Sequence, residues 1–190
     1  MLTLMSSLEF KVIYPGENTI DELEAYGCWL TTWTHAFKEL GLSSIVNSDD
    51  WTRQHEIGAL FEGDMCVGCF LLRIVDLDYV IARQDSYFSA WSFEDMNALR
   101  RDGDTVLVSS YFTVRPSCRG RGVKQELMTR MVERFHSPSF DFCAAMTGCL
   151  RVNKGGNKLV KNYGFETIRT GAVSHGTEVE LMALYRGKKS

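Results

Sequence analysis

One segment constrains the fold of this chain more than any other, because a strand, a basic loop and a helix follow one another directly. The strand is predicted over Thr105–Val114, whose near-continuous apolar sequence is typical of a strand buried on both faces. The loop covers residues 117–122. The helix is predicted from apolar side chains that recur every four residues, at Val123, Leu127, Met131 and Phe135.

The loop has the chemistry of a phosphate site. Gly120 and Gly122 allow a tight turn and a close approach of the backbone to a ligand. The first amides of the following helix have no partner inside the helix, and the helix dipole makes this end partly positive. Four side chains add positive charge: Arg115, Arg119, Arg121 and Lys124. The segment therefore predicts either a cradle for phosphate or pyrophosphate, or a tight turn with a solvated basic rim.

Two common phosphate motifs do not fit this loop. The Walker pattern G-x-x-x-x-G-K-S/T does not occur in the chain. The dinucleotide pattern G-x-G-x-x-G fails because Gln125 stands where the last glycine or alanine is needed.

The rest of the chain alternates strands and helices. Strands are predicted over residues 8–14, 54–61, 65–75, 140–147, 165–169 and 177–185, and residues 62–64 form a hairpin turn. Thr19 and Glu22 predict a capping box at the start of a long helix, and Gly164 is expected to end the helix predicted over residues 153–163. The order predicts one α/β (or α+β) domain over residues 1–190, with an insertion at about residues 76–104.

Composition and charge exclude several classes of protein. With 24 acidic and 21 basic residues the net charge is −3, which argues against a general nucleic-acid binder. No apolar run approaches the roughly 18 residues that a membrane span needs. The first ten residues are too short and too weakly apolar for a secretory signal, and six cysteines are too few for a disulfide scaffold. We therefore expect a cytoplasmic protein with reduced cysteines.

No metal site is expected. Cys66 and Cys69 form a C-x-x-C pair, but no second Cys/His pair stands at metal-binding spacing. Since residues three apart on a strand face opposite sides, we expect two small, separately buried thiols.

Two stretches resemble motifs of the GNAT superfamily of N-acetyltransferases. The sequence Arg119-Gly120-Arg121-Gly122-Val123-Lys124, with Val-x-Pro just upstream, is similar to motif A of that family, R/Q-x-x-G-x-G/A. Residues 153–165 are similar to its later helix, N-x-x-A-x-x-L-Y-x-x-x-G-F, with Asn153, Leu159, Gly164 and Phe165 in register. Lys124 departs from the small residue that usually ends motif A.

The resemblance implies a fold and a co-substrate. The fold would be the single-domain GNAT fold, a central mixed and mostly antiparallel sheet flanked by helices. The co-substrate would be acetyl-CoA or another acyl-CoA. The resemblance assigns the pyrophosphate to the backbone amides of Arg119, Gly120, Arg121, Gly122, Val123 and Lys124. It assigns the pantetheine arm to the main chain of Phe112, Thr113 and Val114 in the preceding strand. Asn153 of the later helix would make a further contact with the cofactor.

The catalytic groups of the family are less evident in this sequence. The tyrosine that often protonates the leaving thiolate aligns with Val160, and Tyr163, about one turn later, is the candidate replacement. Ser109, Ser110 and Tyr111 occupy the strand where the family often carries a basic carboxylate. Glu56, beside His55 at a strand start, is the candidate general base, with an ordinary surface role as the alternative.

Three functions remain open from the sequence. The first is transfer of an acetyl or other acyl group from CoA to a primary amine of a small molecule or protein. The second is long-chain N-acyl transfer from an acyl carrier protein, as in acyl-amino-acid or acyl-homoserine-lactone synthases. The third is an inactive CoA-binding sensor. Aromatic residues either pack the core or line an acceptor pocket: Tyr26, Trp29, Trp33, Phe37, Phe88 and Trp91. The acceptor and the oligomeric state are not predicted.

Overall fold

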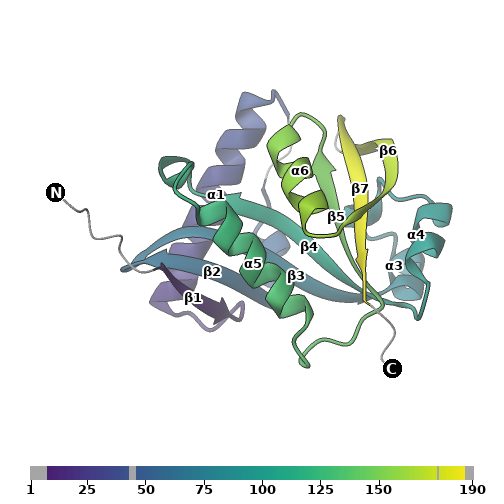
Figure 1. The fold of residues 1–190 in the computed structure, drawn as a ribbon, viewed down its shortest axis with the longest axis horizontal. Coiled ribbons are helices and arrows are strands. Elements are labelled where there is room, and N and C mark those ends of the chain that lie inside the picture. The colour runs from purple at the N-terminus through teal and green to yellow at the C-terminus, as the bar shows by residue number, and fades with distance from the viewer. Residues whose placement is uncertain (1–7, 43–45, 175, 187–190) are drawn as a thin grey trace. The chain divides into compact units, whose positions relative to one another are not determined.

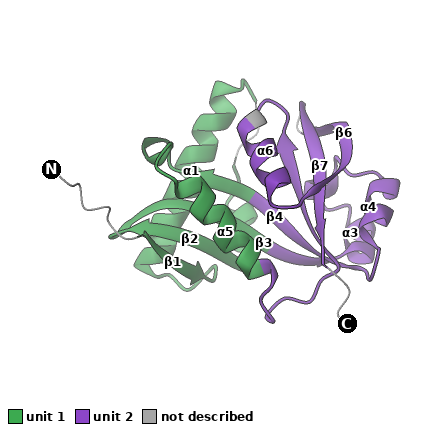
Figure 2. Cartoon of the chain, viewed as in Figure 1, with its two compact units in different colours: residues 1–72, 111–134 green, residues 73–110, 135–190 purple. Residues whose placement is uncertain are grey.

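The computed structural model describes residues 8–42, 46–174 and 176–186 (Figure 1). The N-terminal residues 1–7, on which the expectation about a secretory signal partly rests, lie outside the described residues. The chain divides into two compact units (Figure 2). Unit 1 comprises residues 1–72 and 111–134, and unit 2 comprises residues 73–110 and 135–190. Within the described ranges, no helix combines the length and the apolar content that crossing a membrane requires.

Seven strands form one mixed sheet in the order β1-β2-β3-β4-β5-β7-β6. They are β1 (Leu8–Ile13), β2 (Glu56–Glu62), β3 (Met65–Asp76), β4 (Thr105–Val114), β5 (Ala144–Leu150), β6 (Glu166–Ser174) and β7 (Thr177–Tyr185). β4 and β5 are parallel, whereas the pairs β1–β2, β2–β3, β5–β7 and β6–β7 are antiparallel. The predicted α/β class, a mixed and mostly antiparallel sheet flanked by helices, is confirmed.

In unit 1, α1 (Ile20–Glu39) and α5 (Val123–Phe135) cover opposite faces of the strands. α1 packs with the short α2 (Asp49–Thr52) on a core that contains Trp29, Ile57 and Phe61. α5 lies over the other face, where a Cβ on Gly68 would come 2.7 Å from the Thr113 carbonyl oxygen and 3.3 Å from the Leu127 side chain. Position 68 therefore requires glycine, because β3 and β4 lie so close together there.

The start of α1 differs from the predicted capping box in one arm. The Thr19 side chain accepts a hydrogen bond from the Glu22 backbone N–H at 3.1 Å, as expected. The Glu22 carboxylate, however, accepts from the backbone N–H groups of Gly16 (2.8 Å) and Asn18 (2.7 Å) instead of from Thr19. It also accepts from the indole N–H of Trp51 at 3.3 Å, so this one carboxylate fixes α2 against the start of α1.

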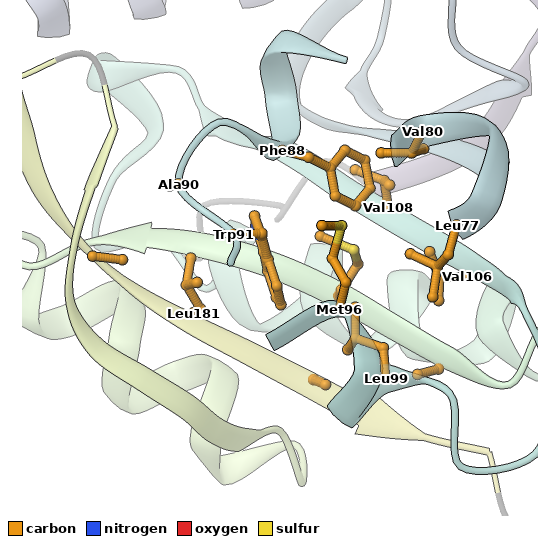
Figure 3. Close-up of a cluster of buried hydrophobic side chains, with 14 of the residues drawn as sticks. Leu77, Val80, Phe88, Ala90, Trp91, Met96, Leu99, Val106, Val108 and Leu181 are labelled. Atoms are coloured by element: carbon orange, nitrogen blue, oxygen red, sulfur yellow. The ribbon is translucent and has the colours of Figure 1, made fainter. Parts of the chain in front are cut away.

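In unit 2, the predicted insertion folds as α3 (Leu77–Arg83), the 3-10 turn η1 (Ser86–Phe88) and α4 (Phe93–Leu99). Ser92 and Asp95 form the reciprocal capping box that starts α4. Figure 3 shows Phe88, Trp91 and Met96 gathered over Val106 and Val108 of β4. Phe88 is 5% exposed and Trp91 is 6% exposed, so these two aromatic residues pack the core of unit 2.

The other face of the strands in unit 2 carries α6 (Lys154–Asn162). Side chains of β7 alternate between the two faces: Val179 and Leu181 belong to the core under α3 and α4, and Glu180 bonds Asn157 and Lys161 of α6. β5 begins at Ala144, later than predicted, because the Phe140 N–H donates to the Ser137 carbonyl in a turn and does not join the strand.

Candidate functional site

The predicted loop is a turn between β4 and α5, and it begins with the 3-10 turn η2 (Pro116–Cys118). Gly120 and Gly122 have φ angles of +80° and +81°, in the left-handed region that side chains disfavour. Nothing lies within 4 Å of a Cβ built on either glycine, so their backbone faces open space. Cys118, within η2, is buried, with 1% of its surface exposed.

The backbone N–H groups of this loop are largely unused by the helix. The first N–H groups that bond to Gly122 O are those of Gln125 (3.0 Å) and Glu126 (3.1 Å). The N–H groups from Gly120 to Lys124 take no part in this helical ladder, whereas the Arg119 N–H donates to Pro116 O at 3.3 Å. These five consecutive amides, from Gly120 to Lys124, lie at a helix start, where backbone N–H groups can bind an anion.

The four predicted cations do not play equal parts. Arg115 points inward. Its Nε donates to the Cys66 carbonyl oxygen at 2.7 Å, and its Nη2 lies 3.5 Å from Glu24 Oε2. Arg121 pairs with Glu62 at 2.5 Å. Among the described side chains, no carboxylate pairs with Arg119 or Lys124. These two cations therefore supply the uncompensated charge of the loop.

β4 changes conformation just before the loop. Tyr111 has a φ of +52°. Among the described residues, the other non-glycine positions with positive φ are Asn18 and Gln84, which lie at helix ends. A non-glycine residue in this region costs about 1–3 kcal/mol, and such strain clusters at functional sites. The parallel pairing of β4 with β5 covers only Val106–Val108. The main chain after that point, at Phe112–Val114, is therefore not used by this pairing.

Contacts from α1 and α2 hold the strained tyrosine. The Tyr111 ring meets the rings of Trp29 and Trp33 edge to face, with centroids 5.6 and 5.3 Å apart. The Thr113 hydroxyl donates to the Tyr111 carbonyl oxygen at 2.6 Å and accepts from the Trp33 indole N–H at 2.9 Å. The Tyr111 hydroxyl donates to Asp50 Oδ2 at 2.8 Å. Sequence reasoning missed Asp50, because 61 residues separate it from Tyr111 and no local pattern links them.

The candidate base Glu56 lies in a buried ion pair. Its side chain is 3% exposed, and both carboxylate oxygens accept from Arg134 of α5, at 2.8 and 2.7 Å. This hydrogen bonding raises the pKa of Arg134. The pair links β2 to α5 within unit 1. Its catalytic role stays a prediction.

The other predicted residues belong to unit 2. Asn153 is the N-cap of α6, and its Oδ1 accepts from the Gly156 N–H at 3.0 Å. Tyr163 is the C-cap of the same helix and is half-buried, and Gly164 follows with a φ of +92° as predicted. Val160 is 8% exposed and packs in the core. The roles of Asn153 and Tyr163 stay predictions.

The expectation that Cys66 and Cys69 face opposite sides is wrong. The register between β2 and β3 shifts at Leu60/Phe61, and the extra residue turns both thiols toward Cys28 of α1. Hydrogen bonding with Cys28, together with burial, raises the pKa of the Cys66 and Cys69 thiols. The described residues include no group of three or more His, Cys, Asp or Glu side chains arranged to hold a metal ion.

Solved structures provide the comparison for this geometry, since no protein-family model and no curated protein sequence matches the chain. NAA60 of Arabidopsis thaliana in complex with acetyl-CoA is 15% identical, with a TM-score of 0.62 over 95% of this chain and 100% of that chain. A GNAT family acetyltransferase from Elizabethkingia anophelis with acetyl-CoA bound is 13% identical, with a TM-score of 0.56 over 94% and 98%. The chain has the GNAT fold.

The name of a third similar structure describes a different acyl-transfer reaction. FeeM, an N-acyl amino acid synthase from uncultured soil microbes, is 13% identical, with a TM-score of 0.65 over 94% of this chain and 91% of that chain. Proteins of this one fold therefore include acetyltransferases and an acyl amino acid synthase, so the fold alone does not decide the acyl donor.

The ion pair of Glu56 and Arg134 gives the first prediction. Arg134→Ala leaves a carboxylate buried without its partner, so we expect a loss of about 3 kcal/mol in the free energy of unfolding, measured by urea denaturation. Arg130→Ala, on the same helix, removes exposed pairs with Glu126 and Glu133 and should cost less than about 1 kcal/mol. Equal losses for the two variants would contradict a structural role for Glu56.

Proposed function

We propose that this chain is a cytoplasmic N-acyltransferase that moves an acyl group, in the simplest case acetyl, from acyl-CoA to a primary amine. The observation that carries the proposal is the set of backbone N–H groups from Gly120 to Lys124, left unused between β4 and α5. The GNAT fold and the acetyl-CoA bound to structures of the same fold support it. The cytoplasmic placement is supported by the six cysteines, all of which are free thiols.

The loop fits the pyrophosphate of CoA. The two left-handed glycines and the open space around them allow phosphate oxygens to reach the amides. Arg119 and Lys124 add charge that no carboxylate of the described chain compensates, whereas Arg121, already paired with Glu62, lies at the rim. Bound acyl-CoA would supply the activated thioester.

The end of β4 fits the next part of the co-substrate. We assign the pantetheine arm to the main chain of Phe112, Thr113 and Val114, which the pairing with β5 does not use. A main-chain N–H on this segment would polarise the thioester carbonyl as negative charge develops on its oxygen. On the family resemblance alone, Asn153 is proposed as a further cofactor contact and Tyr163 as the group that protonates the leaving thiolate.

The binding of CoA is tested by thermal unfolding. A ligand specific for the folded state stabilises it by about 2.7 kcal/mol at a hundred times its Kd, which corresponds to a rise in Tm of roughly 5–10 °C for a chain of this size. We expect this rise with acetyl-CoA and a much smaller one with pantetheine that lacks phosphate. Gly122→Asp should abolish the rise, because its charge and side chain occupy the phosphate position, and Arg121→Ala should only weaken it.

Gly176→Asp is the matched control for that experiment. Gly176 has a φ of +76° and open space around it, so it carries a similar backbone cost, but it lies in unit 2 between β6 and β7. This variant should keep the full rise in Tm with acetyl-CoA. The absence of any rise in the parent, or a normal rise in Gly122→Asp, would contradict the pyrophosphate assignment.

The donor distinguishes the main proposal from its alternatives. A long-chain enzyme would accept acyl groups from an acyl carrier protein, and such docking between charged surfaces weakens steeply with salt. We expect free-thiol release with primary amines to be faster from acetyl-CoA than from a long-chain acyl carrier protein at equal concentration. Faster transfer from the carrier would favour acyl-amino-acid or acyl-homoserine-lactone synthesis, and binding of CoA without turnover of any amine would favour a sensor.

A further inference from the structure

Three thiols lie together in the core of unit 1, and the proposed function uses none of them. Cys28 lies on α1, and Cys66 and Cys69 lie on β3. Their partners on β2, Phe61 and Ala59, belong to the same core as Cys28, so both β3 thiols face α1. Each of the three thiols is hydrogen-bonded to the other two, and all three are free cysteines. We call these three residues the thiol cluster.

A cation lies against the thiol cluster. The Arg115 guanidinium is hydrogen-bonded to Cys28, and its Nε donates to the Cys66 carbonyl oxygen at 2.7 Å. Hydrogen bonding with Cys66 and Cys69, together with the charge of Arg115, lowers the pKa of the Cys28 thiol, although burial opposes this shift. Since the thiolate is the nucleophilic form of cysteine, Cys28 is the reactive member of the cluster.

Cys28 lies one helical turn from an ion pair at the surface of unit 1. Cys28 itself is 2% exposed. Glu24 stands four residues earlier on α1 and therefore lies on the same face of the helix. The side chains of Glu24 and Arg115 are 44% and 30% exposed, and Glu24 Oε2 lies 3.5 Å from Arg115 Nη2. Because such an exposed pair contributes little stability, a local opening there gives a molecule as small as hydrogen peroxide access to Cys28.

We propose that Cys28 and Cys66 are an oxidisable dithiol, which hydrogen peroxide converts into a disulfide between α1 and β3. The Cys28 sulfur attacks one peroxide oxygen, so that an S–O bond forms, the O–O bond breaks, and the displaced hydroxide leaves as water with the Cys28 proton. The Cys66 sulfur then attacks the Cys28 sulfur, and the S–S bond forms as the S–O bond breaks, with release of a second water that carries the Cys66 proton. The two sulfurs lose two electrons and the peroxide gains them. This inference does not depend on the proposed function.

Two observations favour Cys66 over Cys69 as the partner of Cys28. Arg115 contacts both the thiol of Cys28 and the carbonyl oxygen of Cys66, so it holds these two residues together. Hydrogen bonding with Cys66 is also the largest influence on the pKa of Cys28. Disulfides that form in a reducing compartment are usually transient and often sense oxidants, so the pair fits a reversible response to peroxide.

The test is a peptide map of the oxidised full chain. The folded protein is treated at neutral pH with a small molar excess of hydrogen peroxide, unfolded in urea with iodoacetamide to block the remaining thiols, and digested with trypsin. Trypsin gives one peptide with Cys28 (residues 12–38) and one with Cys66 and Cys69 (residues 54–73). We expect these peptides to be joined, two hydrogens lighter than their sum, in a chain that runs as a monomer on a non-reducing gel. Dithiothreitol should separate them.

Single substitutions identify the two sulfurs and the role of the cation. Cys28→Ser and Cys66→Ser should abolish the link, whereas Cys69→Ser should keep it. Arg115→Gln removes the charge beside Cys28, so the smaller thiolate fraction should slow formation of the link by at least about tenfold. If Arg115→Gln does not fold, the peptide map of the parent and the three cysteine variants carry the test.

Cys118→Ser is the matched control. Cys118 is also buried in unit 1, and its Sγ lies 3.9 Å from Arg121 Nη1, but it does not belong to the thiol cluster. This variant should form the link at the rate of the parent. A parent whose Cys28 remains fully alkylated after peroxide treatment, a link that persists in Cys66→Ser, or a link that is lost in Cys69→Ser would overturn the inference. Equal oxidation of Cys118 and Cys28 would overturn it too.

Discussion

Tyr111 occupies the left-handed backbone region inside a strand, and contacts from four side chains hold it there. Two indole rings pack against its ring, Thr113 bonds its carbonyl oxygen, and Asp50 accepts its hydroxyl proton. The strain of about 1–3 kcal/mol persists because these contacts stabilise this conformation over the extended one. The same contacts fix the path of β4 toward Arg115 and the loop. The geometry of the candidate site therefore depends on how α1 and α2 hold one residue.

The loop and the strand are complementary parts of one arrangement in unit 1. The glycines at 120 and 122 turn the chain so that the start of α5 presents its amides, and Gly68 lets β3 approach the main chain of β4 closely. Arg115, with its side chain bonded to the Cys66 carbonyl, ties the loop back to β3. The proposed anion site would thus be built almost entirely from backbone N–H groups, with the cations at its rim contributing charge more than shape.

Much of this was predictable from the sequence, because periodicity and turn chemistry are local. The strand at Thr105–Val114 and the helix from Val123 follow from the apolar pattern, and both have the predicted bounds where these were given. The positive φ of Gly164 follows from its place after a helix. The prediction that Cys66 and Cys69 face opposite sides of their strand was wrong because a bulge between β2 and β3 reverses the side that one thiol faces. Such a bulge leaves no clear mark in the apolar pattern of the sequence. The pair of Asp50 and Tyr111 depends on tertiary packing across 61 residues, and a sequence does not display it.

Amide hydrogen exchange, measured with and without acetyl-CoA, tests the central claim most directly, because the proposed site consists of backbone N–H groups. Amides that donate to phosphate oxygens exchange more slowly with deuterium. In the presence of acetyl-CoA, we expect slower exchange at residues 120–124 and at Phe112–Val114. With inorganic phosphate at the same concentration, we expect at most a small slowing at residues 120–124 and no slowing at Phe112–Val114. Unchanged exchange at residues 120–124 under saturating acetyl-CoA, with protection elsewhere in the chain, would contradict it.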